Sequence, residues 1–183
     1  MSKQERFLES ERVYLRPYNS GDLDFFYKGL YIFETRKLTG LKKVYSREFM
    51  DEYFTKISKD DSRIFLVIAD PQTDELIGDV ELNCIDLLNR SANIRIQISN
   101  ENYLSKGYGT EAMRLLLDYG FGVYNLHRVD LEVYSYNHRA IRAYEKLGFK
   151  KEGIKRQSHY YNHEYHDTIM MGLLKSEFMP ISS

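Results

Sequence analysis

The chain has 183 residues, of which 43% are apolar and 14% aromatic, a composition typical of one globular domain and not of a disordered or fibrous chain. Its 26 Lys and Arg residues nearly balance 27 Asp and Glu residues, and the net charge of -1 excludes an overall basic field that would point to nucleic acid or an anionic membrane. The single cysteine, Cys84, excludes an internal disulfide framework, and because no apolar stretch approaches the ~18 residues of a membrane span, we expect a cytoplasmic protein.

The first half of the sequence predicts an α-rich beginning followed by a β-hairpin. Residues 12–16 alternate between apolar and polar side chains and meet Pro17, which predicts a short strand. Residues 22–30 and 46–57 carry apolar side chains at helical spacing. The hairpin is expected from two dense β-forming runs and the turn between them: residues 64–69, the turn 70–74 and residues 76–85.

The second half alternates strands with helices. The expected elements, in order, are a strand over 93–98, a helix over 109–123, a strand over 128–134, a helix between Asn137 and Gly148, and two strands on either side of 161–164. No linker or repeat divides the sequence, so we expect a single domain over residues 1–183. Its sheet should be mixed, and parallel where a helix connects two strands.

A glycine-rich segment, Lys106-Gly107-Tyr108-Gly109-Thr110, lies where a loop becomes the first of these helices. The first N–H groups of a helix have no partner within it and lie at the positive end of its dipole, and glycine lets a phosphate approach the backbone. The segment therefore predicts a phosphate site, although a tight turn without a ligand has the same pattern. A dinucleotide site is the rival, because Gly107, Gly109 and Ala112 satisfy its relaxed fingerprint, but such a turn normally follows the first strand directly.

The glycine segment is part of a pattern that resembles the GNAT acetyltransferases. Their acyl-CoA loop has the form Gln/Arg-x-x-Gly-x-Gly/Ala, which residues 104–109 match except that Leu104 replaces Gln or Arg. Residues 137–149 are similar to the family's second block, Asn-x-x-Ala-x-x-x-Tyr-x-x-x-Gly-Phe. Similarity covers most of residues 77–173 and looks closest to the branch that contains spermidine N-acetyltransferases and ribosomal-protein alanine N-acetyltransferases. The resemblance implies an α+β fold of the GNAT type: a central mixed, mostly antiparallel twisted sheet, flanked by helices, with parallel strands that separate at the acetyl-CoA site.

The resemblance also implies which residues bind acetyl-CoA and which take part in the chemistry. The amides of Gly107, Gly109 and Thr110 would hold the pyrophosphate, and Asn137 would bind the pantetheine arm. Tyr144 would act as general acid, because the matching tyrosine lies near the CoA sulfur and a phenol can donate a proton at neutral pH. The other expected contacts are the main-chain N–H near Ile98, which would polarise the thioester carbonyl as a bulged strand does in this family, and the residues Leu104, Lys106, Tyr108 and Arg139, although a solvated helix face explains Arg139 equally well.

The proton acceptor for the amine is expected to be Glu81, with Glu101 as second choice. An ammonium group has a pKa near ~10.4, so a carboxylate or a water chain must remove a proton before the nitrogen can attack. Glu81 lies on the strand expected over 76–85, beside the acceptor cleft. A strand carboxylate that faces solvent or an arginine has the same sequence pattern.

The histidines near the C-terminus are expected at the surface of a hairpin or in the acceptor cleft, and a structural role is expected for the cysteine. His159, His163 and His166 lack the spacing of a metalloprotease motif, and in a hairpin the odd- and even-numbered histidines should point to opposite faces, so no metal is expected. Cys84 has no neighbouring base in the sequence and is expected to pack beside apolar side chains.

We therefore expect an N-acetyltransferase that transfers acetyl from acetyl-CoA to a primary amine by direct attack in a ternary complex. A polyamine or similar small amine is the expected acceptor, and the N-terminus of a protein such as a ribosomal protein is the alternative. A non-catalytic acyl-CoA-binding sensor is the alternative of another class. Nucleic acid and membrane partners are not expected, and a homo-oligomer is left open.

Overall fold

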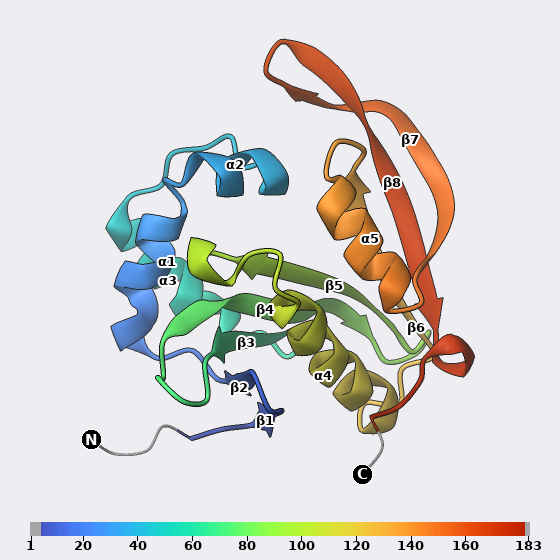
Figure 1. Cartoon of the computed structure of the whole chain (residues 1–183), viewed down its shortest axis with the longest axis horizontal. Coiled ribbons are helices and arrows are strands. Elements are labelled where there is room, and N and C mark those ends of the chain that lie inside the picture. The colour runs from blue at the N-terminus through green and yellow to red at the C-terminus, as the bar shows by residue number, and fades with distance from the viewer. Residues whose placement is uncertain (1–4, 182–183) are drawn as a thin grey trace.

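The computed structural model describes residues 5–181, and its centre is an eight-stranded sheet with the strand order β1-β2-β3-β4-β5-β6-β8-β7 (Figure 1). The strands are β1 (Leu8–Glu9), β2 (Tyr14–Arg16), β3 (Ile64–Ala69), β4 (Leu76–Asp86), β5 (Ser91–Ile98), β6 (Arg128–Tyr134), β7 (Lys150–Tyr161) and β8 (Glu164–Leu174). The helices are α1 (Leu23–Gly29), α2 (Phe33–Thr39), α3 (Arg47–Ile57), α4 (Tyr108–Gly122) and α5 (His138–Lys146), with short 3-10 turns η1 (Ser20–Asp22), η2 (Glu101–Tyr103) and η3 (Lys175–Glu177).

The sheet divides between its central strands. All strand pairs are antiparallel except β5 and β6, and these two run parallel only where Ser91–Asn93 lie beside Arg128–Asp130. Beyond that point β5 stays paired with β4 up to Ile98, whereas β6 stays paired with β8 up to Tyr134. The carboxyl ends of the two parallel strands therefore separate and leave an opening in the middle of the sheet.

Helices cover both faces of the sheet. Side chains alternate between the faces of a strand, and in β3 Leu66 and Ile68 belong to the main core, which includes Leu116 of α4. Val67, which points to the other face, packs instead with Phe26 of α1 and Phe54 of α3. The helices α1 and α3 therefore cover the face opposite to α4. No helix formed by residues 5–181 is long and apolar enough to span a membrane.

Local sequence accounts for the helix ends that border the opening. Asn137 accepts a hydrogen bond from the N–H of Ala140 at 3.1 Å and so caps the start of α5. Gly40 follows α2 with a φ of +69°, a left-handed conformation that favours glycine, and the Tyr134 hydroxyl lies where a β-carbon would be. Asn137 thereby stabilises the start of α5, and Gly40 allows α2 to end close against Tyr134 of β6.

The strands and helices expected from the sequence are present, and the parallel pair lies where a helix connects its two strands. Two elements, β1 and α2, were not predicted. The strand β1 has two residues, and α2 has seven residues that carry no clear apolar stripe, with Phe33 of its first turn 71% exposed. Neither segment has enough periodicity to be recognised without its tertiary contacts.

Two expectations about individual side chains are wrong. His159 and His166 share one face of the β7–β8 hairpin, because the turn at Asn162 and His163 pairs them directly across the two strands. Cys84 is exposed, with a φ of +51°, where the register of β4 against β5 shifts. Within residues 5–181, no group of three or more His, Cys, Asp and Glu side chains is placed to hold a metal ion.

Candidate active site

A cavity of about 330 Å³ lies in the opening between β5 and β6. Residues of both strands, of α2, α4 and α5, and of the loop before α4 line it. Most residues that the sequence singled out are among them: Ile98, Leu104, Gly107, Gly109, Thr110, Asn137, Arg139 and Tyr144. These residues come from three separate segments of the chain, and the division of the sheet brings them together.

The glycine loop has the geometry of a phosphate cradle. Gly107 caps α4 with a φ of +88°, which strains any other residue, and a β-carbon there would lie 3.0 Å from Nη2 of Arg12. A β-carbon on Gly109 would lie 3.2 Å from Cδ1 of Ile96. The amides at the start of α4 are free of intrahelical partners and lie at the positive end of the helix. The loop thus fits the pyrophosphate of a CoA ester, which needs close access to these amides.

Lys106 and Tyr108 do not line the cavity, although they belong to the same loop. The guanidinium of Arg12 lies over the Tyr108 ring at 4.7 Å and donates from Nη2 to the carbonyl oxygen of Lys106 at 2.9 Å. Its Nε also donates to Glu111 of α4 at 2.9 Å. Arg12 therefore braces the outer side of the loop, a contact that no local sequence pattern indicates, since Arg12 is remote in sequence.

The edge of β5 that faces the opening carries free main-chain donors. Successive N–H groups of a strand point to opposite edges, and the N–H of Ser99 donates to Ile77 of β4 at 3.0 Å. The N–H of Ile98 consequently points away from β4, toward the cavity. The β4–β5 register is unshifted from Ile94 to Ile98, so the departure of β6, and not a bulge, exposes this group.

Tyr144 extends from α5 into the cavity, and its ring makes an edge contact with Phe149 at 6.1 Å between centroids. Burial raises the pKa of Tyr144 to about 12, while the positive charge of Arg95 opposes the rise. The phenol is therefore fully protonated at neutral pH and can donate a hydrogen bond or a proton.

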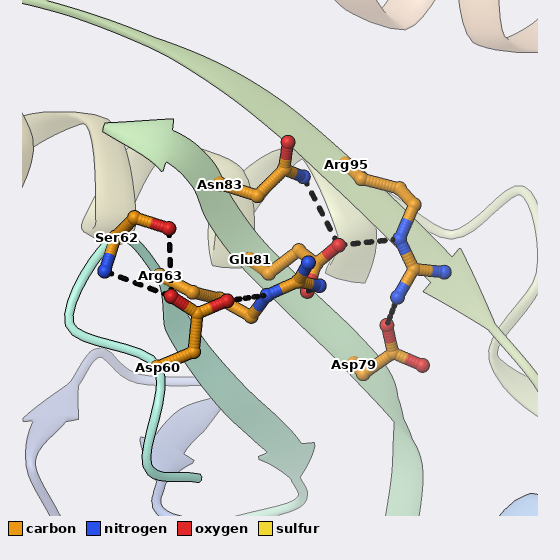
Figure 2. Close-up of polar contacts among 7 residues, drawn as sticks. All are labelled: Asp60, Ser62, Arg63, Asp79, Glu81, Asn83 and Arg95. Atoms are coloured by element: carbon orange, nitrogen blue, oxygen red, sulfur yellow. Dashed lines mark hydrogen bonds and ion pairs between the residues drawn. The ribbon is translucent and has the colours of Figure 1, made fainter. Parts of the chain in front are cut away.

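Glu81 does not line the cavity and is the centre of an ion-pair network (Figure 2). It is 2% exposed, and it accepts from Nη1 of Arg63 at 2.8 Å, from Nε of Arg95 at 2.9 Å and from Asn83 at 3.0 Å. Although burial alone would raise it, the two guanidinium groups hold the pKa of Glu81 below its ordinary value. A carboxylate with three donors and a lowered pKa is poorly suited to take a proton, so the structure argues against Glu81 as the general base.

A second buried carboxylate, Asp79, also holds Arg95. Asp79 is 3% exposed, and its Oδ2 accepts from Nη2 of Arg95 at 3.2 Å. Burial raises the pKa of Asp79 to about 6; Arg95 opposes this shift and the nearby Glu81 adds to it. Arg95 itself lines the cavity, and its side chain is 42% exposed. No local sequence pattern indicates Arg95, because its importance depends on cross-strand partners on β4.

Carboxylates lie along the cavity wall. Glu34 of α2 and Glu101 of η2 are exposed, and Glu132 of β6 forms an ion pair with Lys155 of β7. Glu101, the second choice for the base, thus lies at the cavity where Glu81 does not. These acidic side chains add negative charge to a wall that also carries Arg95 and Arg139.

A divided sheet with a glycine loop at a helix N-terminus, a free strand edge and a protonated phenol defines an acyl-CoA-dependent transferase. A family model described as an acetyltransferase (GNAT) domain matches residues 12–150. The chain therefore belongs to the GNAT acetyltransferase family and is a GNAT N-acetyltransferase, an enzyme class that uses acetyl-CoA.

Several known proteins of this family are similar to the chain. The spermidine N(1)-acetyltransferase of Escherichia coli is 36% identical over 132 residues, which cover 72% of this chain and 69% of that protein. The Vibrio cholerae spermidine N(1)-acetyltransferase is 34% identical over 71% of this chain and 74% of its own length. A crystal structure of the Vibrio cholerae spermidine N-acetyltransferase in complex with CoA and spermine has a TM-score of 0.85 and 30% identity, and covers 92% of this chain and 98% of that one. A dodecameric structure of the Vibrio cholerae enzyme has a TM-score of 0.77 at 29% identity, with 91% and 96% covered.

Replacing Gly109 by Val should weaken CoA binding by about tenfold or more, because the new side chain would occupy space between the α4 amides and Ile96. Gly122→Val is the matched control, since Gly122 lies at the far end of the same helix and a β-carbon there meets nothing within 4 Å. Calorimetric titration of both variants with CoA measures the effect. Equal affinities for CoA in the two variants would show that the loop does not cradle the phosphates.

Proposed function

We propose that this enzyme acetylates a primary amine of a polyamine or a similar small polycation. Similarity to two bacterial spermidine N(1)-acetyltransferases supports this acceptor, and so does the acidic part of the cavity wall at Glu34 and Glu101. A polyamine has several ammonium groups along one chain, so it can place one end at the reacting centre while the others meet these carboxylates. The exposed, acidic cavity wall is the observation that carries the proposal.

Acetyl-CoA supplies an acetyl group activated as a thioester. The amides of Gly107, Gly109 and Thr110 would bind its pyrophosphate, and Asn137 would bind the pantetheine through its side-chain amide N–H, since its oxygen already caps α5. Arg139 lies on the same cavity wall, where it can meet a phosphate. The N–H of Ile98 would donate to the carbonyl oxygen and stabilise negative charge that develops there.

Tyr144 would act as the general acid. In the overall reaction the new C–N bond forms as the C–S bond breaks, the amine nitrogen loses one proton, and the departing thiolate gains one from Oη of Tyr144. The phenolate recovers a proton from solvent or from the product nitrogen, so the enzyme returns to its starting state. Direct attack requires no covalent enzyme intermediate.

The experiment that tests this proposal measures thiol release from acetyl-CoA with spermidine, spermine, propylamine and a peptide that has a free N-terminal Ala. We expect the highest kcat/KM for the polyamines. In Glu34→Gln/Glu101→Gln the KM for spermidine should rise about tenfold, and the KM for propylamine, which has one charge, should rise less. Turnover of the peptide alone would identify a protein N-terminus as the acceptor, and CoA binding without turnover of any amine would identify a sensor.

An assembly of several copies is proposed on the same similarity, because the Vibrio cholerae relative forms a dodecamer.

A further inference from the structure

Among the residues of the network in Figure 2, Arg95 is the one that lines the cavity, and its neighbours hold its side chain in place. Its Nε donates to Glu81 and its Nη2 donates to Asp79, so two buried carboxylates on neighbouring positions of one face of β4 hold two edges of the guanidinium. Within residues 5–181, Nη1 makes no hydrogen bond. A guanidinium clamped in this way presents a fixed positive charge to the cavity.

This clamp is costly to build at Asp79, because taking that carboxylate out of water carries a large penalty that Arg95 only partly offsets. Asp79 shows the cost: its carboxyl keeps its proton to a higher pH than an exposed aspartate. A cross-strand ion pair that served stability alone would not need to keep 42% of the arginine side chain exposed in a substrate cavity. The exposure of Arg95 indicates a role toward what occupies the cavity.

The groups that face Arg95 come from β4, from α3 and from the loop just before β3. Asp79 and Glu81 approach from β4, and neither lines the cavity. Tyr53 approaches from α3, and burial keeps this phenol neutral by raising its pKa. Arg63 lies on the other oxygen of Glu81 and offsets part of its negative charge. The carboxylates therefore lie behind the guanidinium, and the positive end of the arrangement faces the cavity.

Arg95 and Tyr144 line the same cavity, and the proposed role of Tyr144 as general acid makes its end of the cavity the reacting end. Burial raises the pKa of Tyr144, and Arg95 acts in the opposite direction because a nearby cation favours the phenolate. The same field disfavours an ammonium group at that place, since like charges destabilise one another. The rest of the acceptor meets the opposite potential at Glu34 and Glu101.

The inference that follows rests on the proposed acetyl transfer to an amine. Because Glu81 is poorly suited to be the general base, deprotonation of the ammonium group needs another explanation. A primary ammonium with a pKa near ~10.4 must lose its proton before it can attack. We propose that Arg95 is a positioning residue that keeps the reacting nitrogen of the acceptor uncharged in the ternary complex, while Glu34 and Glu101 hold the ammonium groups that do not react. The proton leaves to solvent as the amine enters this end of the cavity, and no side chain has to retain it.

The test compares the pH dependence of single-turnover acetylation, at saturating acetyl-CoA and acceptor, in the wild type and three variants. Asp79→Asn/Arg95→Gln removes one charge of each sign and keeps an amide pair of similar size, so no isolated charge remains buried. Asp79→Asn removes only the negative charge behind Arg95. Arg95→Lys keeps the cation but not the planar fork. Circular dichroism melts establish that each variant is folded.

The rising limb of the rate against pH reports the ionisation of the bound amine. In Asp79→Asn/Arg95→Gln we expect the limb to move up by about one pH unit, which makes acetylation about tenfold slower at low pH and restores the rate at high pH. In Asp79→Asn the limb should move down, because Arg95 then acts with less compensation. In Arg95→Lys the limb should stay near its wild-type position. Spermidine and propylamine should show the same displacement, since Arg95 acts on the nitrogen that both share.

A limb that stays in place in both Asp79 variants, with rates lowered equally at every pH, would overturn the inference and leave Arg95 a structural residue. Displacement of the limb in the same direction in both variants would also overturn it. If the wild type acetylates no amine at any pH, the proposed function fails and the inference fails with it. If the wild type acetylates amines but the rising limb does not move in the charge variants, the inference about Arg95 fails and the proposed function stands.

Discussion

Replacing Tyr144 by Phe should lower kcat by about a hundredfold or more, because the departing thiolate would lose its positioned acid. The substitution removes only the hydroxyl and keeps the ring that contacts Phe149. Binding of CoA should change little, since the glycine loop and the amide of Asn137 are elsewhere in the cavity. Thiol release from acetyl-CoA gives kcat, and calorimetric titration with CoA gives the affinity.

The pH dependence of the wild type provides a second test of the same role. Burial raises the pKa of Tyr144 to about 12, so the phenol stays protonated and no alkaline loss of activity from this group is expected up to about pH 10. If the wild type loses activity on the alkaline side already below about pH 10, and Tyr144→Phe does not, the pKa of the phenol is not raised by burial as the structure indicates. A Phe variant with wild-type kcat would show that solvent or another group protonates the thiolate.

Replacing Asp22 by Ala should destabilise the fold by about 3–5 kcal/mol, because it leaves the Arg16 guanidinium buried without its partner. The two side chains form a two-pronged ion pair, with Nη1 to Oδ2 and Nη2 to Oδ1 both at 2.7 Å, and the residues are 3% and 4% exposed. Asp22 also accepts from the N–H of Asn19 at 2.9 Å, so its loss removes a cap from η1. Urea unfolding of the wild type and the variant measures the difference in free energy of unfolding.

The matched control for Asp22 is Asp24, two residues further along the chain. Asp24 pairs with Arg47, and the side chains of this pair are 63% and 48% exposed. Water solvates both charges, so Asp24→Ala should change the free energy of unfolding by less than about 1 kcal/mol. Similar losses from the two variants would mean that burial of the Arg16–Asp22 pair contributes nothing beyond an exposed pair.

The elements around the glycine loop could be predicted because their signals are local. Two glycines and a helix of period 3.6 define the start of α4, an alternating run defines β6, and Asn137 and Gly148 mark the two ends of α5. Capping, periodicity and turn chemistry act over a few residues, so a single sequence contains them in full. Most of the residues that these motifs singled out line the cavity.

The surroundings of several side chains could not be predicted, because they depend on contacts between segments that are distant in the sequence. Glu81 has the sequence context of a strand carboxylate, and only the positions of Arg63 and Arg95 show that both its oxygens are already paired. Arg12 reaches the glycine loop from the bend between β1 and β2, almost a hundred residues away in the sequence. The pairing of His159 with His166 depends on where the hairpin turns.

The sequence alone therefore determined the fold class, the order of all strands and helices except β1 and α2, and the position of the glycine loop. Tertiary structure decided where β5 and β6 separate, which charges lie opposite one another across β4 and β5, and that the short helix α2 lines the cavity. The physical reason is that backbone conformation follows largely from local propensity. The ionisation and hydrogen bonding of a side chain depend instead on its neighbours in space, and those neighbours come from segments far apart in the chain.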